Sequence, residues 1–101
     1  MNPAETDERP EGTVEAFVRE LRAEISEIDR SLLDGVNRRL EIVRRLHDHK
    51  IAHGMPLRDP EREASLLERL VAENGGPLSA SGVAEFFDHL LALVRRELHG
   101  E

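Results

Sequence analysis

Four basic residues lie on or beside the predicted apolar faces of helices: Arg39 and Lys50 within the face of the first helix, Arg22 at its edge, and Arg62 at the margin of the core. A buried charge without a partner is costly, so cations at these positions require anions from the protein or from a ligand. Several guanidinium groups converging on a pocket suit a small dianion or dicarboxylate, because each binds a carboxylate through two parallel hydrogen bonds. Arg58 lies just outside this group. The alternative is that these cations pair with Asp and Glu on neighbouring helices or extend into solvent.

The only lysine of the chain is Lys50, and every other basic side chain apart from histidine is arginine. A lysine ammonium is a compact point charge, whereas arginine presents a planar fork. A single lysine on the inward face therefore indicates a site that needs a point charge. Chance is the alternative, because the two residue types carry the same sign of charge.

The string RDPERE, residues 58–63, combines Arg62 with two acidic residues that could belong to a site, Asp59 and Glu63. Asp59 precedes Pro60, an order typical of a helix start, where Asp caps the first turn and Pro takes the first position. Glu63 suits the positive end of the helix dipole in the same turn. Both residues thus have a structural explanation, and the string alone does not identify a site.

Other kinds of site have little support in the sequence. The absence of cysteine excludes thiolate catalysis, disulfides and zinc sites built on sulfur. His49 and His53 have the spacing of a helical metal pair, but no third ligand is indicated and His89 and His99 have no matching partner, so we interpret the histidines near the helix end, His47 among them, as solvated. With no nucleophile motif or phosphate loop, we expect chemistry by positioning and charge, not through a covalent intermediate.

The first element that must position these residues is a helix from about Thr13 to Ala52 or His53. It contains no proline, Thr13 is a suitable cap, and Gly54 followed by Pro56 is typical of a helix end. Its apolar residues recur in steps of three and four, which predicts one buried stripe. The stripe consists of Val14, Phe17, Val18, Leu21, Ile25, Ile28, Leu32, Val36, Leu40, Val43 and Leu46.

Two shorter helices follow. The second covers about Pro60 to Glu73, with Leu66, Leu67, Leu70 and Val71 facing inward. The third is capped by Ser79 or Ser81 and runs to about Leu98, after the turn Asn74-Gly75-Gly76-Pro77. With no strand pattern anywhere, the sequence predicts an all-α fold of one long and two shorter helices.

The first helix is too long for one copy of the chain to cover. At 1.5 Å per residue it extends roughly 60 Å, whereas a compact domain of this size has a radius of gyration of about 13 Å. We therefore expect an intertwined homodimer whose six helices form a bundle around a closed polar pocket. Residues 1–12 are predicted to be a frayed tail and residues 13–101 the helical domain.

Composition narrows the partners and the location. The 101 residues carry a formal charge of −7, which argues against binding to nucleic acid or to a membrane surface. No apolar run approaches the roughly 18 residues of a membrane span, and the N-terminus lacks the pattern of a signal peptide. These features predict a soluble cytoplasmic protein.

The spacing of the site residues resembles that of the all-helical class of chorismate mutases. The similarity runs from about Leu21 to Leu70 and is strongest in LRAEISEIDRSLLDGVNRRLEIV, Lys50 and LRDPEREASLLERL. An arginine in the leading segment is followed by a second arginine 17 residues later, a lysine 11 residues beyond it, and then RD-x-x-RE. This resemblance implies an enzyme of aromatic amino acid biosynthesis that converts chorismate to prephenate by a Claisen rearrangement, with no cofactor.

The resemblance also implies a role for each residue. Arg22 is expected to bind a substrate carboxylate in the partner subunit's pocket, Arg39 a carboxylate in its own pocket, and Lys50 the ether oxygen of the bond that breaks. The ring hydroxyl is expected to meet Asp59 and Glu63. Arg62 is expected to support the carboxylate side of the site.

The third helix departs from the family pattern. Many members have a Gln or Glu there that contacts the ether oxygen, with a small polar residue one turn earlier, but an ungapped match places Leu98 and Val94 at these positions, with Glu97 and Arg95 alongside. Either the helix is rotated or the site lacks that donor. Some small family members have a similar C-terminus and resemble partners of the first synthase of the shikimate pathway, so activation by such a synthase is a further hypothesis.

Three alternatives remain open at this point. The same fold could act on 4-amino-4-deoxychorismate, or as an isochorismate pyruvate lyase, because the apolar residues on the third helix weaken the match to chorismate. The third alternative is a non-catalytic helical dimer that binds a partner, which explains the apolar stripe but not Arg39 and Lys50 within it.

Overall fold

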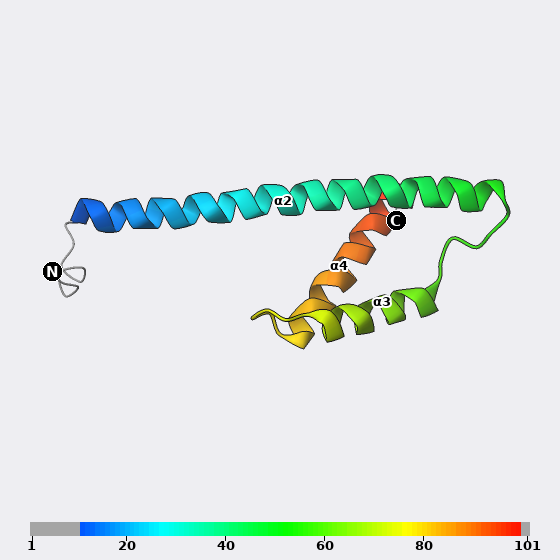
Figure 1. Ribbon diagram of the computed structural model, residues 1–101. Coiled ribbons are helices and arrows are strands. Elements are labelled where there is room, and N and C mark those ends of the chain that lie inside the picture. The colour runs from blue at the N-terminus through cyan, green and yellow to red at the C-terminus, as the bar shows by residue number, and fades with distance from the viewer. Residues whose placement is uncertain (1–10, 100–101) are drawn as a thin grey trace. The chain divides into compact units, whose positions relative to one another are not determined.

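The computed structural model describes residues 11–99, which form three α-helices: α2 (Glu11–Ala52), α3 (Pro60–Glu73) and α4 (Ala80–His99) (Figure 1). No β-strand occurs among these residues, so the predicted all-α fold with one long and two shorter helices is confirmed. The described chain divides after Arg39 into an N-terminal and a C-terminal unit. Most of the predicted tail, residues 1–10, lies outside the described residues.

Helix α2 begins two residues earlier than predicted. Gly12 and Thr13 lie inside the helix that starts at Glu11, so the prediction of Thr13 as the cap is wrong. A helix start is decided by small contributions, and an acidic residue such as Glu11 in the first turn is favoured by the helix dipole. The end of α2 at Ala52 agrees with the prediction.

The N-terminal unit is described over residues 11–39 and consists of α2 alone. Its large apolar side chains recur at the predicted spacing, yet they are between 39 % and 60 % exposed. They are Val14, Phe17, Val18, Leu21, Ile25, Ile28 and Leu32. A continuous apolar face of this size is unusual on a monomer and marks a surface of interaction.

Helix α2 ends in a turn that depends on Gly54. Gly54 has φ +66°, its N–H donates to the carbonyl of Ile51 at 3.2 Å, and the N–H of Met55 donates to the carbonyl of Lys50 at 2.8 Å. These two bonds form a Schellman motif, which satisfies carbonyls at the helix end and requires a left-handed residue that glycine supplies at least cost. The turn therefore fixes the last helical residues, Lys50 among them.

Helix α3 has the bounds that the sequence predicts. Asp59 is its N-cap, with Oδ1 accepting from the backbone N–H of Arg62 at 3.1 Å, and Pro60 is the first helical residue. The four residues predicted to face inward are half-buried. They are Leu66, Leu67, Leu70 and Val71. The cap and the apolar face thus both follow from local sequence.

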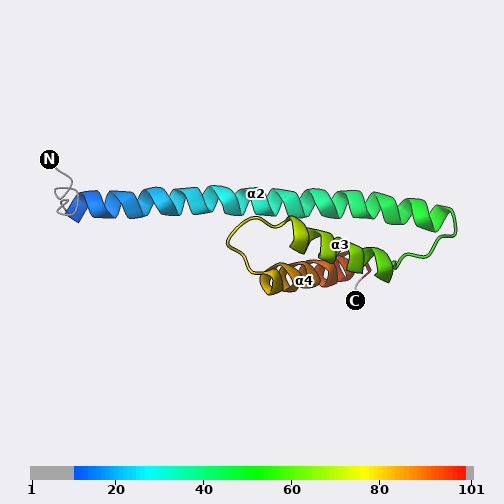
Figure 2. The same ribbon diagram turned by 60° about the horizontal axis from the view of Figure 1, so that its bottom comes forward.

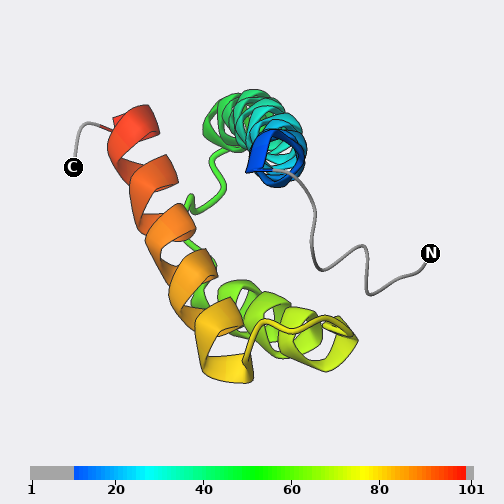
Figure 3. The same ribbon diagram turned by 90° about the vertical axis from the view of Figure 1, so that its left-hand side faces the viewer.

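Helix α4 supplies the buried core of the C-terminal unit. Val83, Leu90 and Val94 are 5–8 % exposed, and they recur at the spacing of one helix face. Of the two predicted caps, Ser79 is the residue that caps: its Oγ accepts from the backbone N–H of Gly82 at 3.0 Å. Helices α3 and α4 pack together (Figure 2), and Figure 3 shows the same pair from another side.

Residues 11–99 include no helix that is both long enough and apolar enough to cross a membrane.

We expect the substitution Gly54→Ala to lower the free energy of unfolding by about 1 kcal/mol, because a Cβ is unfavourable at positive φ. Urea unfolding followed by circular dichroism measures the change. Gly75→Ala is the matched control: Gly75 lies in a turn without positive φ, and nothing lies within 4 Å of the place that an added methyl group would take. Equal losses of stability in the two variants would contradict this role of Gly54.

Candidate functional site

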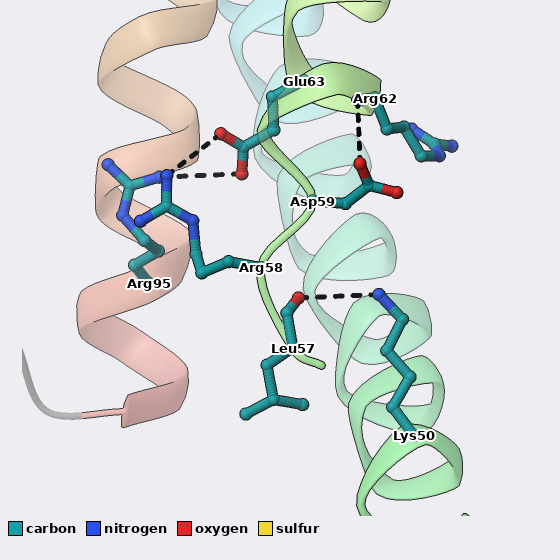
Figure 4. Close-up of polar contacts among 7 residues, drawn as sticks. All are labelled: Lys50, Leu57, Arg58, Asp59, Arg62, Glu63 and Arg95. Carbon is teal, nitrogen blue, oxygen red and sulfur yellow. Dashed lines mark hydrogen bonds and ion pairs between the residues drawn. The ribbon is translucent and has the colours of Figure 1, made fainter. Parts of the chain in front are cut away.

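Lys50 lies at the C-terminal end of α2, in the turn closed by the Schellman motif. It is half-buried, and its Nζ donates to the carbonyl oxygen of Leu57 at 3.5 Å (Figure 4). A bond of this length is weak, so an anion could replace the carbonyl at little cost. The fold thus holds one ammonium group beside the connection that leads into α3.

Asp59 and Arg62 share the first turn of α3. The cap uses Oδ1 of Asp59, whose side chain is exposed, and this local bond fixes the carboxylate at the helix N-terminus. The side chain of Arg62 is also exposed and is directed away from Glu63 in Figure 4. Asp59 and Lys50 therefore lie at the two ends of the connection between α2 and α3, whereas the Arg62 guanidinium points away from Glu63 (Figure 4).

Glu63 stands between two arginines. Its Oε1 accepts from Nη2 of Arg58 at 3.4 Å, and its Oε2 lies 3.8 Å from Nη1 of Arg95 on α4. The side chains of Glu63 and Arg95 are each 30 % exposed, whereas that of Arg58 is 57 % exposed. Figure 4 shows both guanidinium groups turned toward the one carboxylate. This ion-pair cluster joins α4 to the start of α3.

Helix α4 carries the two residues that depart from the family pattern, Val94 and Leu98. Val94 is one of the three buried core residues, and Leu98 is half-buried. Two neighbouring residues of α4 contact other elements: Arg95 lies close to Glu63, and His99 stacks on His47. The sequence analysis named Arg95 only as a neighbour of Val94 and Leu98. Its position directly after the core residue Val94 was the signal that could have identified it as a contact residue.

The two remaining predicted residues belong to the N-terminal unit. Arg39 is half-buried, while Arg38 beside it is exposed, as expected if Arg39 is in phase with the apolar stripe. Arg22 is exposed on the same helix. The structure therefore gathers Lys50, Asp59 and Glu63 in the C-terminal unit and places the other two cations along α2.

Two histidine pairs lie near the end of α2. The rings of His47 and His99 stack with centroids 5.0 Å apart and an interplanar angle of 14°, so His99 has a stacking neighbour that its place in the sequence did not indicate. The rings of His49 and His53 lie 4.2 Å apart, and Nδ1 of His53 is 2.9 Å from the carbonyl of His49. Within residues 11–99 no three potential ligands gather into a metal site.

Burial lowers the pKa of His47 below its ordinary value of 6.5, and the positive charges of His99 and Lys50 lower it further, while Asp48 opposes the shift. The Nδ1 atom of His47 is buried and makes no hydrogen bond within the described chain. A neutral ring suits this position, because a protonated Nδ1 would carry an unsatisfied donor beside two other basic groups. The stacked pair of His47 and His99 is therefore more stable at neutral pH than at acidic pH.

Comparison with known proteins finds a family whose members this chain matches. Residues 21–98 match the family described as chorismate mutase type II. The chain is 45 % identical over 78 residues to a T-protein of Enterobacter agglomerans, covering 76 % of this chain but only 20 % of that protein. It is 36 % identical over 79 residues to a 4-amino-4-deoxychorismate mutase of Streptomyces venezuelae, covering 75 % of each.

A solved structure also resembles this chain. Chorismate mutase from Thermus thermophilus, in its form I, superposes with a TM-score of 0.74 at 27 % identity. The superposition covers 76 % of this chain and 96 % of that one. The resemblance therefore extends over nearly the whole of that chain.

We expect the stability that His47 contributes to be complete above about pH 6.5 and to be lost as the pH falls through its lowered pKa, because the unfolded chain then binds a proton that the folded chain does not. Urea unfolding at about pH 7.5 and pH 5 measures this loss. The variant His47→Gln should lose less stability over this interval than the wild type, and His89→Gln, an exposed change on α4, should behave as the wild type. Parallel losses in the wild type and His47→Gln would reject this role.

Proposed function

Because the chain belongs to the chorismate mutase type II family, we propose that it catalyses the rearrangement of chorismate to prephenate. The observation that carries this proposal is the family match over residues 21–98, since it includes all six residues that the spacing predicts for the site. Those residues are Arg22, Arg39, Lys50, Asp59, Arg62 and Glu63.

Binding of the substrate is the first task of the site. Chorismate is a flexible dicarboxylate, and its reacting conformer is a folded, chair-like form that is costly in entropy. Arg39 binds one carboxylate and Arg22 of the partner subunit binds the other, each through paired hydrogen bonds. The half-buried position of Arg39 supports this role, because a guanidinium partly removed from water gains more from a bound anion than an exposed one does.

Lys50 acts on the bond that breaks. As the C–O bond stretches, negative charge develops on the ether oxygen, and a positioned ammonium stabilises that charge more than it stabilises the ground state. The fixed turn at the end of α2 supports this role, because it orders the helical residue that carries the ammonium before substrate arrives. Such a preorganised donor contributes about 3 kcal/mol, or roughly a hundredfold in rate.

The start of α3 orients the ring of the substrate. Asp59 and Glu63 accept hydrogen bonds from the ring hydroxyl, and Arg62 supports the carboxylate side. Asp59 is held by its cap and Glu63 by its two arginines, so both carboxylates are ordered without substrate. The chemistry is intramolecular and needs no cofactor or metal.

The active form is an intertwined homodimer. The exposed apolar face of residues 14–32 supports it, because a second copy of the same helix is the surface whose length and periodicity match. In this arrangement Arg22 of one subunit completes the pocket of the other, and six helices form the bundle. We place this dimer in the cytoplasm, with activation by the first synthase of the shikimate pathway as a further partner relation.

A second candidate reaction keeps the same fold and changes the substrate. The relative from Streptomyces venezuelae is a 4-amino-4-deoxychorismate mutase and aligns with three quarters of this chain. Its substrate differs from chorismate in the ring substituent that meets Asp59 and Glu63. Product analysis with chorismate, 4-amino-4-deoxychorismate and isochorismate separates these activities, and the absence of turnover and binding with all three would favour a non-catalytic dimer.

We expect Lys50→Ala and Arg39→Ala each to lower kcat/KM for chorismate by at least a hundredfold, because each removes a charge that faces the substrate. Consumption of chorismate and formation of prephenate are followed on purified chains. The matched control is Arg30→Ala, which removes an exposed arginine of α2 paired only with Glu27 at 3.3 Å and should keep full activity. Full activity in Lys50→Ala or Arg39→Ala would remove that residue from the site.

Mixing two inactive variants tests the shared pocket. If Arg22 acts across the dimer, a heterodimer of Arg22→Ala and Lys50→Ala subunits contains one pocket with both native residues and one with neither. Refolding an equal mixture should therefore restore about a quarter of the wild-type activity, since half of the dimers are heterodimers and half of their pockets are intact. If Arg22 acts within its own subunit, the mixture stays inactive; sedimentation of each variant confirms that dimers form.

A further inference from the structure

The Glu63 cluster carries more positive than negative charge. Arg58 and Arg95 approach different oxygens of the same carboxylate, at 3.4 Å and 3.8 Å, from the connection before α3 and from α4. The first guanidinium group neutralises the charge of the carboxylate, and the second adds one net positive charge. The cluster therefore presents a net positive charge to any group that approaches Glu63.

Further charges surround the cluster, and Glu61 in the first turn of α3 is one of the acidic ones. Among the seven residues of Figure 4, four side chains are cationic and two are carboxylates, and Asp59 directs one oxygen to the helix cap. The ammonium of Lys50 donates to a backbone carbonyl and not to an acid. The Glu63 cluster by itself, two arginines and one carboxylate, therefore sets up a positive local field although the whole chain has a formal charge of −7.

The ring substituent of the substrate meets this field. A hydroxyl is neutral and can donate a hydrogen bond to Glu63 while both arginines stay in place. An alkyl amine is an ammonium ion at neutral pH, and beside Glu63 it would be a third cation next to Arg58 and Arg95, with Asp59 as the second carboxylate that meets the ring substituent. Like charges held close together repel, and such repulsion is a common means of rejecting a similar ligand.

We propose that Arg95, with Arg58, makes Glu63 selective for a ring hydroxyl over a ring ammonium group. This inference rests on the proposed function and names its substrate class. Arg95 is the principal determinant because its side chain is 30 % exposed, whereas Arg58 is 57 % exposed and more strongly screened by water. Arg95 acts through Glu63 and is a positioning residue.

A purely structural role for the cluster predicts something different. Exposed or half-exposed ion pairs contribute little to stability, and loss of one would alter the turnover of both substrates alike. Selectivity instead changes their ratio. Because the ammonium stays charged from binding to transition state, its repulsion should appear mainly in KM, with kcat nearly unchanged.

The test compares chorismate with 4-amino-4-deoxychorismate on the purified full chain. We expect the wild type to favour the hydroxyl substrate in kcat/KM by at least about tenfold, with a higher KM for the amino substrate. Arg95→Gln should reduce that preference about tenfold by lowering the KM of the amino substrate, while Arg95→Lys, which keeps the charge, should retain it. The matched control Arg96→Gln, an exposed neighbour on α4, should leave the ratio unchanged.

The outcomes separate this inference from the proposed function. A wild type that uses the amino substrate equally well or better, or an Arg95→Gln variant that slows both substrates by the same factor, overturns the inference and leaves a mutase in place. A wild type that turns over neither substrate overturns the proposed function, and the inference with it. Circular dichroism of each variant identifies any that fails to fold, and Arg95→Lys then decides the role of the charge.

Discussion

An apolar helix face that its own chain leaves exposed is the constraint on which the assembly depends. Along residues 14–32 of α2 the large apolar side chains are at least 39 % exposed, and the two shorter helices bury only three residues of their own. Burial of such a face contributes roughly 25 cal/mol of stabilisation for each Å² removed from water, so pairing with a second copy of the helix would be strongly favourable. In the proposed dimer the helix that forms the interface also carries Arg22 and Arg39. Formation of the dimer therefore also assembles the substrate-binding site.

Under the proposed function, the C-terminal unit holds charged side chains in place before substrate binds. Its devices are local: a Schellman turn at the end of α2, an aspartate cap on α3, and an ion-pair cluster around Glu63. Each orders a charged side chain through its own backbone or an immediate neighbour. A site built in this way loses little conformational entropy when the ligand arrives, which is the condition for catalysis by positioning.

Sequence reasoning succeeded where structure is decided locally. The bounds of α3, the end of α2 at Gly54 and the cap at Asp59 follow from residues adjacent in the chain, and the structure confirms them. The start of α2 differed by two residues, because a first turn is decided by fractions of a kcal/mol. Contacts between helices were less accessible: the packing of α3 against α4 decides that Val94 is buried and that Arg95 lies close to Glu63.

The positive cluster at the start of α3 also bears on how a dianion reaches the protein. At a distance the formal charge of −7 repels such a ligand, whereas close to Glu63 the guanidinium groups of Arg58 and Arg95 attract it. The Debye length is about 8 Å at physiological ionic strength, so added salt screens the distant repulsion before it weakens the close attraction. On this hypothesis association is fastest at intermediate ionic strength, and a rate constant that only falls as salt is added would refute it.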